Sequence, residues 1–228
     1  MSQSFTSFVR DDLVRLDGVR KLSPTRRAPA IFTTESVSDS VFFVESGFVK
    51  IVRRERDSRE VLVGIVPPGN VFGEEALFVN GHRQFAAEVL RDGTVYEIPH
   101  ELFLEVCKAR PDVWRMISEV LALRARDLQK TVATLCVCDV ELRILHCLRH
   151  LAPVFGRHGS DEYTLPMTQV EVAQLVGATR ETTSTILNCL DRRGLIILGR
   201  GHLRVPSISA LQPAILRRKA KARAAGND

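Results

Sequence analysis

The sequence predicts an α+β protein in three parts: an N-terminal roll of short strands, a long helix and a C-terminal winged helix-turn-helix. Short apolar runs separated by turn residues fill the first half, the apolar period becomes helical after Pro99, and two capped helices are expected within residues 168–190. Strands that precede helices along a chain are typical of this class. We expect the three parts at residues 1–110, 111–138 and 139–228.

The composition is that of a globular protein. Hydrophobic residues make up 45% and charged residues 26% of the 228 residues, as in ordinary soluble domains. No apolar run reaches the roughly 18 residues of a membrane span. The opening stretch MSQSFTSFVRDD lacks the apolar segment of a secretory signal. We therefore expect a cytoplasmic protein with no membrane partner.

Part of the net charge of +5 lies near the C-terminal end. The basic residues there are Arg217, Arg218, Lys219, Lys221 and Arg223. A basic tail of this kind is usually solvated and disordered, and it also fits a polyanionic partner.

The five cysteines do not indicate a disulfide framework, because their number is odd and the expected compartment is reducing. Cys136 and Cys138, one residue apart, can be interpreted as a metal-binding or oxidation-sensing pair. Most of the cysteines lie among apolar residues. This favours buried thiols that act as small hydrophobic side chains.

The first half of the chain predicts several short strands. Apolar runs flank Ser46-Gly47, residues 67–70 form a strong turn, and Asp92-Gly93 separates two further runs as a hairpin turn would. Turns about every ten residues are typical of a small barrel or roll. A short helix is expected within residues 5–22.

A helix of about 25 residues is expected from Pro111 onward, because Pro is favoured in a first helical turn. Apolar residues follow at spacings of three, four and seven: Val113, Ile117, Val120, Leu121, Leu128, Val132 and Leu135. An apolar seam of this kind is expected to be buried against another surface, and a second copy of the helix would bury it in a homodimer. The alternative is that the helix only packs on the roll. Arg124, near the seam, disfavours a regular coiled coil.

A helix-turn-helix is predicted after a further helix that Asp139 begins as N-cap. Thr168 and Glu171 have the spacing of a capping box, and Thr179 is placed to cap the second helix. Between the two helices, Gly177 permits a left-handed turn, and the small Ala173 allows close approach.

The second helix of this motif would insert its first turns into the major groove of DNA. Arg180 can donate two hydrogen bonds to guanine, and Glu181 can accept one from cytosine. The hydroxyls of Thr179, Thr182, Ser184 and Thr185 suit phosphates or bases, and Thr168 and Gln169 join the expected interface from the first helix. A hairpin with its turn at Gly199-Arg200-Gly201 is also predicted. We interpret it as a wing whose Arg200 contacts phosphate. Without the neighbouring turn, Arg180 and Glu181 would be interpreted as a solvated surface pair.

These segments resemble the CRP/FNR family of bacterial transcription regulators. The similarity is carried by VFFVESGFVKI, PPGNVFGEEALF, the helix ending in CDVELRI, and MTQVEVAQLVGATRETTSTILNCLDRRGLI. The resemblance implies a cyclic-nucleotide-binding β-roll (a double-stranded β-helix, like a jelly roll), a dimerisation helix and a winged helix-turn-helix. It further implies palindromic promoter sites and an effect on RNA polymerase. Thr185 stands where cAMP receptors place a second base-reading Arg.

The resemblance also implies an effector site, from which this chain departs. In cAMP-binding members a Gly-Glu pair is followed by an Arg-Ser pair that holds the cyclic phosphate. Gly73-Glu74 matches the first pair, but without an alignment gap the second pair falls on Gln84-Phe85. Arg83 is one position early and would face inward only with a bulge or a shorter loop. The adenine-binding hydroxyls of the long helix correspond to Leu128 and Gln129. These departures disfavour a cAMP site, identify no cofactor and leave a small-molecule effector open.

The function that these observations favour is a homodimeric, sequence-specific DNA-binding transcription regulator, controlled by an effector or a redox signal in the roll. The alternative is an effector-binding module that acts through protein partners without specific DNA binding. An enzyme is not expected, because no catalytic set, phosphate loop or metal-ligand cluster is evident in the sequence.

Overall fold

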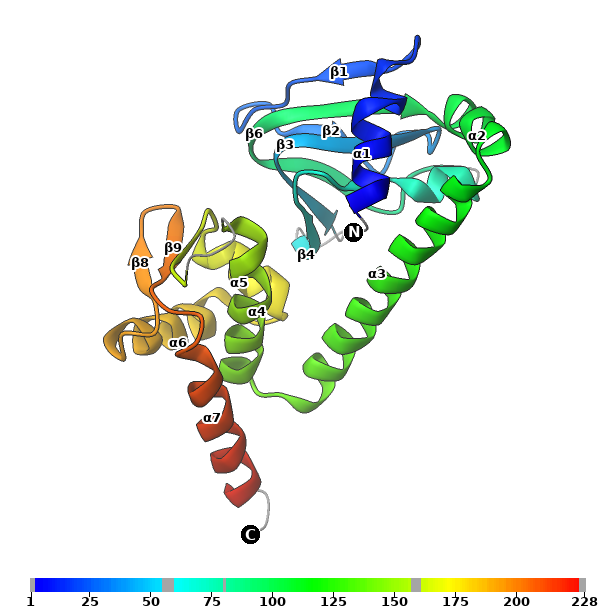
Figure 1. Cartoon of the computed structure of the whole chain (residues 1–228). Coiled ribbons are helices and arrows are strands. Elements are labelled where there is room, and N and C mark those ends of the chain that lie inside the picture. The colour runs from blue at the N-terminus through cyan, green and yellow to red at the C-terminus, as the bar shows by residue number, and fades with distance from the viewer. Residues whose placement is uncertain (1–2, 55–59, 80, 157–160, 226–228) are drawn as a thin grey trace. The chain divides into compact units, whose positions relative to one another are not determined.

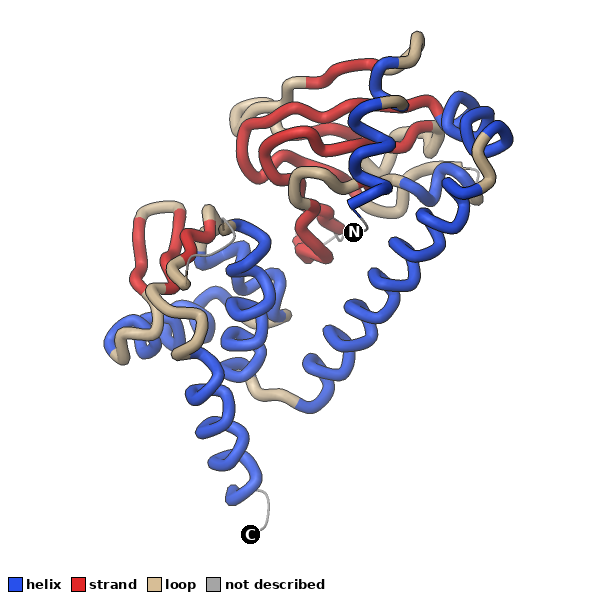
Figure 2. The backbone as a smooth tube through the Cα atoms, viewed as in Figure 1, coloured by secondary structure: helices blue, strands red, loops and turns tan. Residues whose placement is uncertain are grey.

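The computed structural model describes residues 3–54, 60–79, 81–156 and 161–225. The chain forms two compact units, Met1–Gln129 and Lys130–Asp228, so the division falls within a long helix (Figure 1). The first unit is built on an antiparallel sheet, and the second is mainly helical with a small sheet of its own (Figure 2). This is the α+β architecture that the sequence predicts.

The first unit begins with α1 (Gln3–Asp11) and a single 3-10 turn, η1 (Leu13–Arg15). Its strands are β1 (Arg20–Leu22), β2 (Ala30–Phe32), β3 (Ser40–Arg54), β4 (Glu60–Val66), β5 (Val71–Phe72) and β6 (Ala86–Pro99). They pair in the order β1-β6-β3-β4, with β2 added to β6 and β5 added to β3. The turn η2 (Glu74–Leu77) lies between β5 and β6, and α2 (His100–Ala109) follows β6.

The predicted hairpin at Asp92-Gly93 is wrong. Strand β6 continues through this dipeptide and pairs with β3 on both sides of it. The glycines of the two strands instead allow a close approach, because a Cβ on Gly47 would lie 2.7 Å from the carbonyl oxygen of Arg91. The register shifts at the same place, so the glycines mark a bulge between two long strands.

Two apolar clusters fill the first unit. One lies inside the roll and includes Phe32, Phe42 and Phe72. The ring centroid of Phe42 lies 5.1 Å from that of Phe32 and 5.2 Å from that of Phe72, and the centroids of Phe32 and Phe72 are 6.0 Å apart. The other joins β3, β5 and β6 to α1, α2 and the beginning of α3 (Asp112–Val137). The roll therefore shares its second core with the helices that flank it in the sequence.

The predicted seam of α3 divides into two parts. Val113, Ile117 and Val120 are only 0%, 4% and 4% exposed, because they belong to the core that α3 shares with the roll. Leu121 packs partly buried against the same core. The predicted place of Val113, Ile117 and Val120 in a dimer interface is therefore wrong: here the alternative holds, and this part of the helix packs on the roll.

The second half of the seam differs. Leu128, Val132 and Leu135 are 53%, 58% and 40% exposed. This half of the seam is thus available to a partner.

The second unit contains α4 (Val140–Phe155), β7 (Tyr163–Leu165), α5 (Gln169–Val176), α6 (Arg180–Arg192), β8 (Ile197–Gly199), β9 (His202–Val205) and α7 (Leu211–Ala225). The strands pair in the order β7-β9-β8. Asp139 caps α4 as expected, since its side chain accepts a hydrogen bond of 3.0 Å from the backbone N–H of Leu142. The core is formed by apolar side chains of all four helices and of the wing sheet.

The expectation of a disordered basic tail is wrong, because this part of the chain forms α7. Leu211 and Ile215 are buried and anchor the helix. Farther along, Arg218 forms ion pairs with Asp139 at 3.0 Å and Glu141 at 3.2 Å. The helix is thus fixed to the beginning of α4 by apolar contacts followed by charge pairs.

Candidate functional site

The first helix of the helix-turn-helix, α5, has the capping box that its sequence predicts. The hydroxyl of Thr168 accepts a hydrogen bond of 3.2 Å from the Glu171 N–H, and a carboxylate oxygen of Glu171 accepts one of 2.8 Å from the Thr168 N–H. The helix ends at Gly177, whose φ of 61° and ψ of 47° are left-handed. Both ends of α5 are therefore defined by local chemistry.

Arg143 of α4 holds the turn between α5 and α6, a role that sequence reasoning missed. Its Nη1 donates to the carbonyl oxygens of Val176 at 3.0 Å and Gly177 at 3.2 Å. Its Nε donates to the carbonyl oxygen of Cys138 at 3.0 Å. One guanidinium thus joins the turn to the junction between α3 and α4. No local sequence signal indicates the contact with the turn, because those two carbonyl oxygens lie 33 and 34 positions away in the sequence.

The first turn of α6 presents charged side chains to solvent. Thr179 caps the helix by accepting a hydrogen bond of 3.2 Å from the Thr182 N–H. Arg180 and Glu181 are exposed, and no hydrogen bond or ion pair within the described residues engages either side chain. Buried Leu187 and Leu190 hold the other face of the helix on the core. Arg180 and Glu181 are therefore free to bind an external partner.

The hydroxyls of α6 have different hydrogen-bonding capacities. Thr179 donates to the Thr182 hydroxyl at 3.0 Å, and Thr185 donates to the carbonyl oxygen of Glu181 at 3.0 Å. Thr182 and Ser184 are acceptors in their described contacts, so their hydroxyl protons remain available. Thr183 is fully buried and faces the core. A phosphate oxygen needs a donor, which favours Thr182 and Ser184 over the other two predicted hydroxyls.

The remaining predicted contacts lie on α5 and the wing. Thr168 and Gln169 are half-buried at the beginning of α5. Arg200 is exposed in the two-residue turn of the β8–β9 hairpin, where Gly199 pairs with His202.

In the first unit, three of the predicted effector residues lie close together: Gly73, Glu74 and Arg83. Gly73 has a φ of 74° and is the N-cap residue directly before η2. Arg83 is 2% exposed, and its Nη1 donates to the carbonyl oxygen of Gly73 at 3.1 Å. It faces inward because it precedes β6 in an irregular segment, so the strand alternation that opposed this orientation does not apply. Gln84 is exposed, as are Leu128 and Gln129 on α3.

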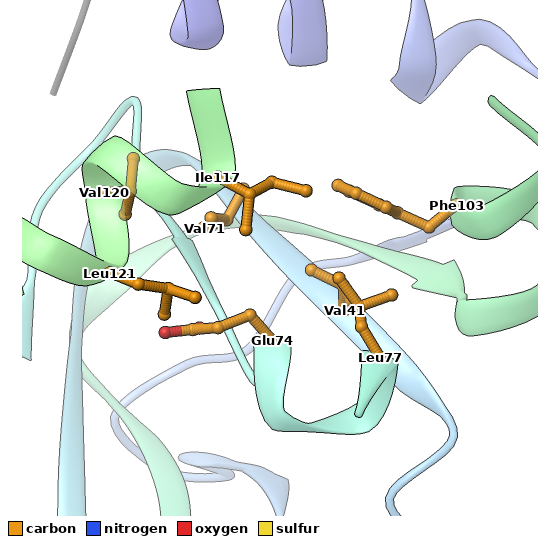
Figure 3. A pocket seen from close by; sticks show the side chains of 8 residues that line it. All are labelled: Val41, Val71, Glu74, Leu77, Phe103, Ile117, Val120 and Leu121. Carbon is orange, nitrogen blue, oxygen red and sulfur yellow. The ribbon is translucent and has the colours of Figure 1, made fainter. Parts of the chain in front are cut away.

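Glu74 connects this site to α3. Its carboxylate accepts a hydrogen bond from Arg124, which also donates to the carbonyl oxygen of Val71. Glu74 is the one charged side chain around a small cavity whose other lining residues are Val41, Val71, Leu77, Phe103, Ile117, Val120 and Leu121 (Figure 3). The cavity measures about 10 Å³, which is room for about one water molecule. It cannot hold a nucleotide in this conformation.

The thiols are less buried than expected. Cys136 and Cys189 are exposed and Cys138 is intermediate, so the expectation of buried filler is wrong for the first two. Burial raises the pKa of Cys107 to about 11 and that of Cys147 to about 12. Within the described residues, no group of three or more His, Cys, Asp or Glu side chains is arranged to hold a metal ion.

Sequence comparisons agree with both halves of this structure. Residues 26–110 match the cyclic nucleotide-binding domain, and residues 142–214 match the Crp-like helix-turn-helix domain. The CRP-like cAMP-activated global transcriptional regulator of Mycobacterium tuberculosis is 34% identical over 174 residues, which are 75% of this chain and 78% of the relative. The cyclic AMP receptor protein of Thermus thermophilus is 27% identical over 196 residues, 85% of this chain and 86% of that protein.

Solved structures show the same fold. FixK2 from Bradyrhizobium japonicum superposes with a TM-score of 0.73 at 20% identity, covering 86% of this chain and 96% of its own. The c-di-GMP responsive global regulator CLP of Xanthomonas campestris gives 0.68 at 26% identity, covering 82% and 92%. None of the described helices combines the length and apolarity that crossing a membrane requires. The chain belongs to the CRP/FNR family: it is a DNA-binding transcription regulator with an effector-binding domain, and not an enzyme.

Proposed function

We propose that this regulator acts as a homodimer on pseudo-palindromic promoter sites, with α6 of each subunit in the major groove of one half-site. The observation that carries the proposal is the first turn of α6, where exposed Arg180 and Glu181 have no partner within the described residues. Two such helices on a two-fold axis would lie about 34 Å apart, one turn of DNA. The same regulator would recruit or block RNA polymerase in the cytoplasm.

The test of base recognition is selection of binding sites from random DNA, followed by substitution of Arg180. Arg180→Ala should lose about 1–3 kcal/mol of discrimination at one base pair. Arg192→Ala is the matched control, because it removes an exposed Arg from the last turn of the same helix. It should change affinity equally for all sequences. Equal specificity ratios for wild type and Arg180→Ala would contradict the assignment.

Phosphate contacts would fix the orientation of α6 on the duplex. Thr182 and Ser184 are favoured for these contacts because their hydroxyl protons remain available for donation. Arg200 would contact phosphate from the wing. Thr168 and Gln169 at the beginning of α5 complete the proposed interface. The basic helix α7 fits the same polyanion, since residues 211–225 contain five Lys and Arg and no Asp or Glu.

The proposed dimer uses the second half of α3. Leu128, Val132 and Leu135 are large, exposed and spaced by four and three residues, which is the spacing of a helix-pairing seam. Sedimentation should show that Val132→Asp produces monomers that lose specific DNA binding. Val63→Asp, at an exposed apolar position on β4, should remain dimeric. A dimeric Val132→Asp protein would contradict this interface.

We propose a small-molecule rather than a redox signal in the roll. Cys107 is the only cysteine of the first unit, and burial with a pKa of about 11 leaves little reactive thiolate. The pair between Glu74 and Arg124 offers a route from the roll to α3. A signal that changes this pair would alter the pose of the DNA-binding domains through that helix.

A further inference from the structure

Arg83 is a cation enclosed within the roll. Its guanidinium carbon lies 4.5 Å from the ring centroid of Phe32 and 5.5 Å from that of Phe42. Its side chain is only 1% exposed. Burial of a charge in such surroundings is costly unless an opposite charge and hydrogen-bond acceptors accompany it. The partners of Arg83 therefore decide what the interior of the roll can accept.

Those partners all come from the chain itself. Nη1 donates to the carbonyl oxygen of Gly73 at 3.1 Å and to Oε1 of Glu75 at 2.7 Å, and Nη2 donates to the carbonyl oxygen of Ser40. Glu75 is the single carboxylate that pairs with Arg83 among the described residues. Only Nε lacks a hydrogen-bond partner there. The charge of Arg83 is thus already balanced internally.

Backbone geometry closes the space around the guanidinium. A Cβ on Gly73 would lie 2.9 Å from Nη1 of Arg83 and 3.1 Å from the Phe42 ring. The positive φ of Gly73 holds its carbonyl oxygen on the arginine. An incoming anion could reach Arg83 only by replacing one of the present acceptors. The most replaceable is the Glu75 carboxylate, because the other two are backbone carbonyls.

We propose that Glu75 is a specificity-determining residue of the effector domain: its carboxylate occupies the anion position of Arg83 and excludes anionic effectors from the roll. The side chain of Glu75 is 45% exposed, so it reaches Arg83 from the solvent side. Its neighbour Glu74 is 15% exposed and pairs with Arg124 of α3. The two adjacent carboxylates thus have separate tasks, one as internal counter-ion and one as contact to α3. The proposal rests on the proposed role of the roll as an effector domain.

The test is the Glu75→Gln substitution, which preserves size and removes the charge. Arg83 then lacks its counter-ion, and an external anion should take the vacated position. Inorganic phosphate and cAMP are titrated separately while Trp114 fluorescence follows thermal unfolding of the first unit. The Glu75→Gln protein should bind phosphate at least tenfold more tightly than wild type, and a response to cAMP but not phosphate would point to a phosphodiester. Glu45→Gln is the control, because it removes an exposed charge of the same unit that has no contact with Arg83.

The wild-type titration is decisive even if Glu75→Gln does not fold. An unchanged unfolding temperature of wild type with millimolar phosphate and cAMP supports the proposal, whereas a rise of the wild-type unfolding temperature with either anion overturns it. A phosphate response of Glu75→Gln no greater than that of Glu45→Gln also overturns it. None of these measurements involves DNA, so a failure of the proposed DNA-binding function would appear separately, in the Arg180→Ala experiment.

Discussion

Gly177→Ala tests whether the turn between α5 and α6 depends on backbone conformation alone. Gly177 has a φ of 61° and a ψ of 47°. A Cβ there would lie 3.5 Å from Cδ2 of Leu135 and 3.8 Å from Nη1 of Arg143, which are ordinary contact distances. Steric clashes of the added Cβ therefore contribute little to the cost of the Gly177→Ala substitution. The cost of the left-handed conformation for alanine is about 1–2 kcal/mol, and the second unit should lose that much stability.

Gly177→Asn separates conformational strain from side-chain volume. Asparagine is larger than alanine but tolerates the left-handed region better. It should therefore destabilise the second unit less than alanine does. If contacts with Leu135 or Arg143 decided the outcome, the order would be reversed.

The full chain contains an internal control for this measurement. Its single tryptophan, Trp114, lies on α3 in the first unit, where its ring centroid is 5.8 Å from that of Phe78. Tryptophan fluorescence should report an unchanged transition, while hydrogen exchange of α5 and α6 amides should show the loss. For a domain of this size, the melting temperature shifts by about 4–8 °C per kcal/mol. Equal stability of the alanine variant and wild type would refute the strain argument.

Three further outcomes are expected. Thiol reagents should label exposed Cys136 and Cys189 in the folded protein, whereas buried Cys107, whose pKa burial raises to about 11, should react only on unfolding. Burial, aided by nearby basic side chains, lowers the pKa of His146 below its ordinary value of 6.5. The folded state then binds fewer protons, so the stability of the second unit should fall as the pH drops through 6.5, and His146→Gln should flatten this dependence in chemical denaturation. Deletion of residues 219–228 should reduce the salt dependence of DNA binding. The slope of log affinity against log salt concentration should fall in magnitude by about 0.9 for each phosphate that this segment neutralises. An unchanged slope would place α7 outside the interface.

The helix-turn-helix was the most predictable part of the chain, because local chemistry defines its boundaries. Thr168 with Glu171, Gly177 and Thr179 each act within four residues, and all have the predicted conformations. The predicted wing turn is likewise a two-residue hairpin, which neighbouring residues specify.

The errors concern interactions between distant segments. Gly93 resembles a hairpin glycine in sequence, but it lies opposite Gly47 of another strand. The basic tail has little apolar pattern of its own, yet contacts with α4 accompany its folding as α7. Arg143 binds carbonyl oxygens more than thirty positions away. Spacing along one segment carries no information about such partners.

The apolar residues of α3 form two separate surfaces, which the sequence pattern alone presents as one seam. The buried stripe of Val113, Ile117 and Val120 continues, four residues on, at Arg124, which pairs with Glu74 of the roll. A second stripe starts one residue away from Val120, at Leu121, and reaches the exposed Leu128. Successive helical residues differ by about 100° in direction, so the two stripes face different surroundings. Arg124 is therefore the polar end of the roll-facing stripe and not a defect in a seam. It lies one turn before Leu128, so the pair between Glu74 and Arg124 marks the place where the buried surface of α3 gives way to the exposed one.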